Sequence, residues 1–402
     1  MKTIRFAASA TLAAATVLFG TAGFAATPTS QAGKALQYLG TQQLADGSID
    51  DALGETADYA LGAKFQGIDP KTLKASSGKS VYDYMALWLA ASTNCVGKTT
   101  DRDGNTIGKL VEAVVAGGYN PTSFGGRNLL ADLEGPGATT GGAYNQGTAS
   151  FRDCISGGQN AVYAQANGIL GLTAARNPGY PVPAAAVQRL RGQQDKSGAW
   201  ATFGSTNTNA TGLALMALAP LQTFCGAPTD PVLAAALAYL HGQQDPASGG
   251  FPYSSAFGAA SDPDSDALVI QALVAVLQDP GSAAWTNSSG NPTTDIRTFQ
   301  DAAGGGFKFD HGSGTKPDAF TTSEVPPGLD RAPFPSGTVN AVAVTCPVSP
   351  TPVASAAPRL PRAGLSRSDN AVPVAPASLV LVGLLVGGGL FARAARRRLR
   401  RD

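Results

Sequence analysis

A short motif recurs along the chain and limits the possible folds more than any other feature. Its copies are "GTQQLADGSI", "GQQDKSGAW" and "HGQQDPASGGF", which begin at residues 40, 192 and 241. In each copy a leucine stands three residues before the first glutamine, and a glycine turn follows. The segment before each copy has amphipathic helical spacing, and the segment after it is richer in apolar and small residues. Such repetition indicates stacked copies of one unit, here a helical hairpin.

The hairpins predict two layers of helices. A helix that is hydrophobic nearly all round is a buried one, so the second helix of each pair is expected inside and the first outside. We expect inner helices at residues 56–65, 81–92, 161–175, 208–221, 265–278 and 318–325. Residues 108–118 are expected to form an outer helix. About six such pairs close into a ring, so the predicted fold is all-α, an α/α toroid.

The repeated motif resembles the QW repeat of squalene and terpene cyclases. Residues that match it in the first copy are Lys34, Ala35, Tyr38, Leu39, Gln43 and Gly47, with Ile49 in place of the tryptophan. Those of the second are Leu190, Gln194, Gly198 and Trp200. Those of the third are Tyr239, Leu240 and Gln244, then Gly250 and Phe251 after a one-residue insertion.

The resemblance covers residues 30 to 330, approximately, and implies the helical ring that terpene cyclases share with protein prenyltransferase β subunits and with the helical domain of intrinsic factor. In that family the glutamine ties helix ends together and the aromatic ring packs on it. Side-chain amides are suited to this task because they satisfy free main-chain groups at helix ends. We therefore interpret the motif as structural.

Both ends of the chain carry targeting signals. Residues 1–25 have the basic start, apolar run and small-residue ending of a signal peptide. Residues 377–392 form an apolar segment predicted to cross a membrane, and the arginine-rich tail 393–402 is expected in the cytoplasm. The ectodomain, residues 26–346, and a proline-rich stalk, residues 347–376, are then outside the cell.

The stalk contains "LPRAG", which resembles the sortase signal of Gram-positive surface proteins, Leu-Pro-x-Thr-Gly. Ala363 stands where that signal has threonine. The predicted location is the extracellular face of the cell membrane, with attachment to the cell wall depending on cleavage at this site.

The charge of the exported part argues against nucleic acid as a partner. The whole chain has a formal charge of +1, but most of the excess arginine lies in the tail and the stalk. Without the terminal segments the ectodomain has about eight more acidic than basic residues and no basic stripe. Its four cysteines predict two disulfides, and we favour Cys95 with Cys154 and Cys225 with Cys346 among three possible pairings.

The signatures of known catalytic sites are incomplete. Class II terpene cyclases use the central acid of Asp-x-Asp-Asp, and "SDPDSDAL" (261–268) lacks the adjacent pair of aspartates. Asp264 and Asp266 are expected to cap a helix start, with a proton-donating role for Asp264 or Asp266 as the alternative. The zinc ligands of prenyltransferases have no counterpart at ligand spacing, and the second wall of a cobalamin site is absent after residue 346. No metal or cofactor is expected.

These observations predict a surface-displayed, non-catalytic module that binds a small molecule, a glycan or a protein at the mouth of its ring. The residues expected to contact the ligand are Tyr84, Trp88, Tyr163, Asn207, Asn209 and Asp266. Aromatic faces beside amide and carboxyl groups are typical of such clefts. The alternatives are a terpene-cyclase-like enzyme with an aspartate as general acid, and cobalamin-type binding together with a partner protein.

Overall fold

The computed structural model describes residues 30–335 apart from residues 90–101, 136–141, 155, 223–229, 256–257, 259 and 313. All of them belong to the first of two units, Met1–Val344. The predicted signal peptide, stalk, membrane segment and tail lie outside the described residues, as do Cys95, Cys225 and Cys346. Within the described part of the chain, none of the helices has the length and hydrophobicity that crossing a membrane requires.

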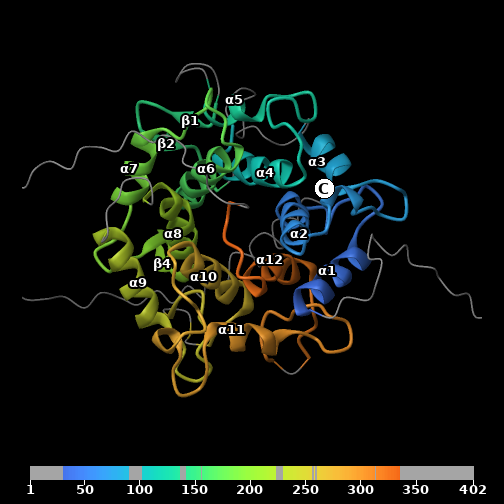
Figure 1. Cartoon of the computed structure of the whole chain (residues 1–402). Helices are drawn as coiled ribbons and strands as arrows, with labels where there is room; N and C mark the ends of the chain where they lie inside the picture. Colours follow the sequence, from blue (N-terminus) through green and yellow to red (C-terminus); the bar gives the residue numbers. More distant parts are fainter. Residues whose placement is uncertain are drawn as a thin grey trace, which may run out of the picture. The chain divides into compact units, whose positions relative to one another are not determined.

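Helices of the inner layer form a closed ring (Figure 1). They are α2 (Leu53–Phe65), α4 (Gly104–Ala116), α6 (Ala161–Ala175), α8 (Thr208–Gln222), α10 (Pro263–Ala275) and α12 (Ala319–Leu329). Each packs against the next one along the chain, and α12 packs against α2, which closes the ring. The ring of helical hairpins predicted from the sequence is therefore confirmed for the described residues.

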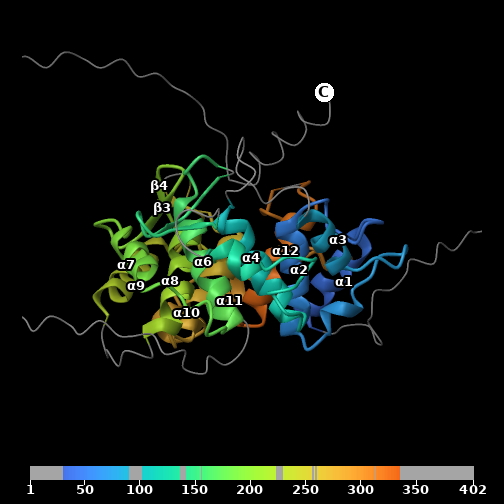
Figure 2. The same cartoon turned by 90° about the horizontal axis from the view of Figure 1, so that it is seen from above.

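Outer helices lie around this ring (Figures 1 and 2). They are α1 (Gln31–Gln42), α3 (Val81–Leu89), α5 (Leu129–Leu133), α7 (Ala184–Gly192), α9 (Pro231–Gln243) and α11 (Pro292–Asp295). Short 3₁₀ turns are η1 (Pro70–Thr72), η3 (Ala283–Trp285) and η4 (Ile296–Phe299). The main hydrophobic core lies between the two layers and includes Trp200, Phe251 and Trp285, which are almost completely buried.

Two short antiparallel ribbons, which the sequence patterns did not predict, connect outer to inner helices. β1 (Tyr144–Asn145) pairs with β2 (Ser150–Phe151), and β3 (Trp200–Thr202) pairs with β4 (Ser205–Asn207). In the second ribbon Trp200 is opposite Asn207. The ribbon β3–β4 immediately precedes α8. The ribbon β1–β2 lies before α6 in the chain, and β2 contacts this helix.

The layer predicted for two helices was wrong. Residues 81–92 were expected inside, but α3 is an outer helix that packs on α2 and η1. Residues 108–118 were expected outside, but α4 is an inner helix between α2 and α6. Lys109 of α4 forms an ion pair with Asp58 of the inner helix α2. Gly108 allows this packing, because a Cβ atom there would lie 2.1 Å from the carbonyl oxygen of Asn167 on α6.

Gln194 and Gln244 join neighbouring outer segments, as the resemblance implied, whereas Gln43 donates to the carbonyl oxygen of Gly47 in its own turn. Nε2 of Gln194 donates to the carbonyl oxygens of Gly198 (2.9 Å) and Val232 (2.8 Å), the latter in α9. Nε2 of Gln244 bonds in the same way to Gly249 and Trp285, both at 2.8 Å. Gln194 and Gln244 thus each hold their own turn and the start of the next outer segment.

A fourth glutamine closes the circle of outer helices. Nε2 of Gln300 donates to the carbonyl oxygens of Gly305 and of Gln31 in α1, both at 2.8 Å. Gly305 has φ +78°, and a Cβ atom there would lie 2.8 Å from the carbonyl oxygen of Lys34, so glycine is needed for this approach. The stretch "FQDAAGGGF" (299–307) is therefore a further copy of the motif.

Cys154 is disulfide-bonded. The other three cysteines lie outside the described residues, so its pairing with Cys95, and that of Cys225 with Cys346, stay predictions.

Candidate functional site

The end of each motif shows which side of an inner helix faces outward. The main-chain N–H of the motif's last residue donates to a side chain on the following inner helix. The acceptors are Thr56 Oγ1 for Ile49 (2.9 Å), Thr211 Oγ1 for Trp200 (3.1 Å), Asp266 Oδ1 for Phe251 (2.7 Å) and Thr322 Oγ1 for Phe307 (2.8 Å). Each acceptor is the fourth residue of its helix, so the four helices share one register.

This register identifies the residues that face the ring centre. Two residues along an α-helix correspond to a rotation of about 200°, so the positions two before and two after an outward residue lie on the opposite side. In α6 the outward position belongs to Gln165, which accepts from the N–H of Phe151 at 3.0 Å. In α4 the outward position belongs to Ile107, the fourth residue of that helix.

Two levels of inward residues result. The level nearer the N-terminal ends of the inner helices contains Gly54, Asn105, Tyr163, Asn209, Asp264 and Phe320. The next level contains Asp58, Lys109, Asn167, Leu213, Leu268 and Glu324. Contacts across the ring wall agree with this assignment, because Nδ2 of Asn167 donates to Oδ1 of Asn105. Charged residues thus come from the adjacent helices α12, α2 and α4, and leucines come from α8 and α10.

An ion pair joins α4 to α2 at the second level. Nζ of Lys109 lies 2.7 Å from each carboxylate oxygen of Asp58. The Lys109 side chain is 27% exposed and that of Asp58 is 5% exposed, so solvent reaches the pair from the lysine side. Burial raises the pKa of Asp58, and Lys109 offsets only part of this rise. Burial acts to lower the pKa of Lys109, but Asp58 and Glu324 outweigh it and the pKa is raised.

Two glutamates beside this pair hold protons at neutral pH. Burial raises the pKa of Glu112 to about 8, against the effect of Lys109. Glu112 is 3% exposed, and its Oε2 has no hydrogen-bond partner. Burial, together with the charge of Asp58, raises the pKa of Glu324 to about 8 as well. The Glu324 residue as a whole is only partly buried.

The two aspartates singled out from the sequence have different positions. Asp264 is 4% exposed at the inward first level, and its Oδ1 has no hydrogen-bond partner. Burial and then the neighbouring Glu324 and Asp262 raise the pKa of Asp264 well above its ordinary value. Asp266 occupies the outward position that threonine holds in α2, α8 and α12. Burial and Asp295 raise its pKa.

The cap of α10 is Asp262, which precedes the expected Asp264 and Asp266. Asp262 caps α10 by accepting from the N–H of Ser265 at 2.8 Å, and Asp264 and Asp266 lie in the first turn. Burial raises the pKa of Asp262 to about 6. The capping role therefore belongs to Asp262, which leaves Asp264 free to face the ring.

The structure brings only some of the predicted ligand-contacting residues to the ring centre. Tyr163 and Asn209 lie at the first level. Tyr84 and Trp88 are on the outer helix α3, because the layer of this helix was predicted wrongly. Asn207 is completely buried and accepts from the N–H of Ala210 at 2.8 Å, as a cap of α8 does.

Sequence reasoning missed Asp58, Lys109, Glu112 and Glu324. A signal was present, since these are ionisable residues within helices that are otherwise apolar or rich in small residues. In the described part of the chain no group of histidine, cysteine, aspartate and glutamate residues is arranged to hold a metal ion.

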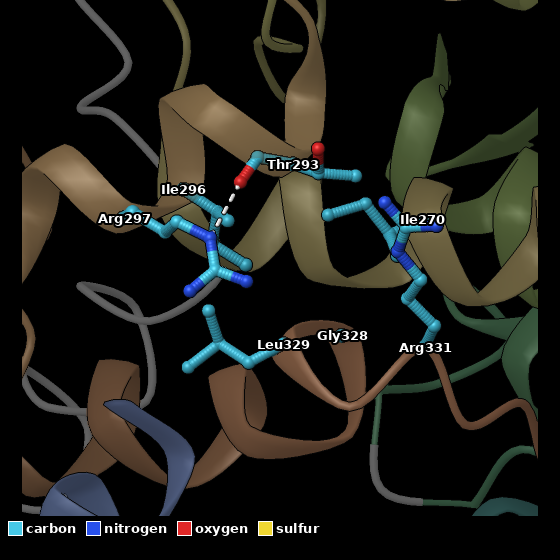
Figure 3. A pocket seen from close by; sticks show the side chains of 7 residues that line it. All are labelled: Ile270, Thr293, Ile296, Arg297, Gly328, Leu329 and Arg331. Atoms are coloured by element: carbon cyan, nitrogen blue, oxygen red, sulfur yellow. Dashed lines mark hydrogen bonds between the residues drawn. The ribbon is translucent and has the colours of Figure 1, made fainter. Parts of the chain in front are cut away.

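A small pocket lies beside the C-terminal end of α12 (Figure 3). Its lining includes Ile270, Gly328, Leu329 and Arg297, whose Nε donates to the carbonyl oxygen of Thr293 at 3.0 Å. The pocket has room for about one water molecule. It is therefore too small for a ligand, and the candidate site rests on the ionisable and amide residues of the two inward levels.

Comparisons with solved structures find other proteins of similar fold. A protein from Actinoplanes matches with a TM-score of 0.46 and 15% identity over 75% of this chain and 98% of that one. The type II terpene cyclase MstE from Scytonema matches with a TM-score of 0.46 and 13% identity over 75% and 98%. A structure described as a wild-type glycosidase has a TM-score of 0.44 and 15% identity over 75% and 97%. Scores at this level assign no activity to the chain.

No protein-family model matches the sequence, and no curated protein matches it.

Proposed function

We propose that this protein is a ligand-binding α/α toroid displayed on the outer face of the cell membrane. The observation that carries the proposal is the inward wall of the ring, where Asn209, Tyr163 and Glu324 are only partly buried. Deeply placed polar groups are costly to bury, and their concentration at one place is typical of a binding site.

The chemistry of the wall favours a neutral ligand that carries hydroxyl groups, such as a sugar. Amide groups donate and accept hydrogen bonds, and the protonated carboxyl of Glu324 donates one. Tyr163 and Phe320 supply aromatic surface beside these polar groups, a combination that suits the mixed polar and apolar faces of sugars.

Binding is tested by titrating the purified protein with a panel of neutral mono- and oligosaccharides. We expect at least one sugar to bind, and the variants Asn209→Ala and Glu324→Ala to weaken it tenfold or more. The exposed asparagine variant Asn120→Ala is the matched control and should bind as the unaltered protein does. Equal binding by all three variants would place the ligand elsewhere.

Display outside the membrane is tested separately by protease treatment of intact cells. The signal peptide and the arginine-rich tail predict opposite sides of the membrane for the two ends. Protease should release a fragment that ends in the stalk, before Ser378, and leave the tail protected. Digestion of the ectodomain only after lysis would contradict this orientation.

Acid catalysis is the second candidate function. It is favoured by the unpartnered oxygen of Asp264, whose pKa is raised by burial and by the neighbouring Glu324. A carboxylic acid kept neutral in an apolar site is suited to protonate a bound substrate. Incubation with squalene and with prenyl diphosphates, followed by product analysis, tests this candidate. A cyclised product that disappears in Asp264→Asn would establish an enzyme, and the absence of any product would leave binding as the function.

A further inference from the structure

The ion pair between α2 and α4 consists of two groups that can react with each other. An amine and a carboxylic acid condense to an amide when they are held together and shielded from water. Nζ of Lys109 is 2.7 Å from both oxygens of Asp58. Because both oxygens are bonded to Cγ, Nζ lies about 3 Å from that carbon in the plane of the carboxylate, and attack requires Nζ to move out of this plane.

We propose that Lys109 and Asp58 form an intramolecular isopeptide bond, with Glu112 as the acid–base group that moves the protons. The bond would join the second helices of the first two hairpins across 51 residues of sequence. It does not depend on the proposed ligand binding, because the reacting groups and the acid all belong to the chain.

Glu112 is placed for this role by the helix. It is three residues after Lys109 in α4, so both side chains lie on the same face of the helix. Its Oε2 is buried without a hydrogen-bond partner, and burial keeps the carboxyl protonated at neutral pH. A buried acid beside a reacting amine and carboxyl can accept a proton from one and return it to the other.

The reaction balances without any other reagent. Proton transfer within the pair converts the ammonium and the carboxylate to the neutral amine and the carboxylic acid. Nζ of Lys109 then attacks Cγ of Asp58, and the C–N bond forms. Glu112 donates its proton to the departing hydroxyl group, so one C–O bond breaks and one water leaves, and its carboxylate then takes a proton from the nitrogen. Glu112 ends in its starting state.

Burial favours the product over the ion pair. The carboxylate of Asp58, which is 5% exposed, retains the free-energy cost of its lost hydration, whereas an amide carries no net charge. The fixed geometry also replaces the encounter of two separate molecules, which is worth a large factor in effective concentration. The ion pair Arg191–Asp230 is a useful contrast, because guanidinium does not condense with a carboxylate in this way.

Peptide mapping of the full-length chain tests the proposal. After reduction and digestion with trypsin, Asp58 belongs to the peptide 35–64 and Lys109 ends the peptide 103–109. A lysine in amide linkage is not cleaved, so the bond predicts a branched product that joins 35–64 to 103–127. The mass of this product should be lower by one water than the summed masses of the peptides 35–64 and 103–127.

Variants separate the bond from the ion pair. Lys109→Arg keeps the charge and should give only unlinked peptides. Glu112→Gln should reduce the branched product at least tenfold, whereas Glu134→Gln, which changes a glutamate at the end of the outer helix α5, should leave it unchanged.

The proposal would be overturned if the unaltered chain gave only the unlinked peptides 35–64 and 103–109, whatever the variants do. Equal amounts of branched product from Glu112→Gln and from the unaltered chain would overturn the role of Glu112. Circular dichroism of each variant shows that its result comes from a folded protein.

Discussion

The contacts between outer helices and the inward wall of the ring are built from the same hairpins, but their residues follow opposite rules. Gln194, Gln244 and Gln300 make the same two hydrogen bonds at successive contacts between outer segments. At the second level of the wall, equivalent positions are charged on α12, α2 and α4 and leucine on α8 and α10. The repeated residues therefore stack the hairpins. The wall residues that differ from one hairpin to the next give this ring its particular chemistry.

The largest expected effect comes from the tryptophan of the repeated motif. Trp200 is completely buried, and its Nε1 donates to the carbonyl oxygen of Leu190 at 2.7 Å. Trp200→Ala leaves a cavity and an unpaired carbonyl, and we predict a loss of about 3–5 kcal/mol in the free energy of unfolding. Denaturant unfolding measures it. A loss below about 1 kcal/mol would contradict the structural role of the motif.

Gln300→Ala should also destabilise the ring. The substitution removes two hydrogen bonds, including the one to Gln31 that joins the last copy of the motif to α1. We predict a loss of about 2–3 kcal/mol, since two main-chain carbonyls lose their partner. Gln42→Ala, at a glutamine that bonds only to the neighbouring Thr41 in the described contacts, is the matched control and should cost less than about 0.5 kcal/mol.

The fold could be predicted from the sequence because its main signal is repeated. Copies that end at Ile49, Trp200 and Phe251 confirm one another, so the hairpin and the ring followed from them. The layers of α3 and α4 could not be assigned in this way. The sequence of α4 does not tell its layer, and only the closed ring shows that Lys109 pairs with Asp58 and that Glu112 is buried.

The candidate site was less predictable because it depends on helix register. The spacing of "SDPDSDAL" alone does not tell which aspartate faces inward. The hydrogen bond from the N–H of Phe251 fixes Asp266 on the outward side, and it turns Asp264 inward. Tyr84 and Trp88 were chosen as aromatics on an expected inner helix, so the error in the layer of α3 carried over to them.

A pH series on Glu324→Gln tests the wall of the ring. The pKa of Glu324 is about 8 in the folded protein and 4.5 ordinarily, so the folded state keeps a proton that the unfolded chain has lost. The stability of the unaltered protein should therefore fall as the pH rises between these values. Glu324→Gln lacks this contribution. The unfolding free energy of the variant relative to that of the unaltered protein should therefore rise with pH, by at most about 1.4 kcal/mol per pH unit, and level off above about pH 8. Parallel stability curves would contradict a protonated Glu324.

The smallest effect is expected for Asp266→Thr, and it tests whether Asp266 belongs to the repeated contacts. Threonine accepts the equivalent N–H at Thr56, Thr211 and Thr322, so it should accept that of Phe251 as well. The change in unfolding free energy should therefore stay within about 1 kcal/mol. Asp266→Leu removes the acceptor and should cost about 1–3 kcal/mol, because the N–H of Phe251 is then buried without a partner. Equal losses for threonine and leucine would show that Asp266 has a role other than the one threonine has in α2, α8 and α12.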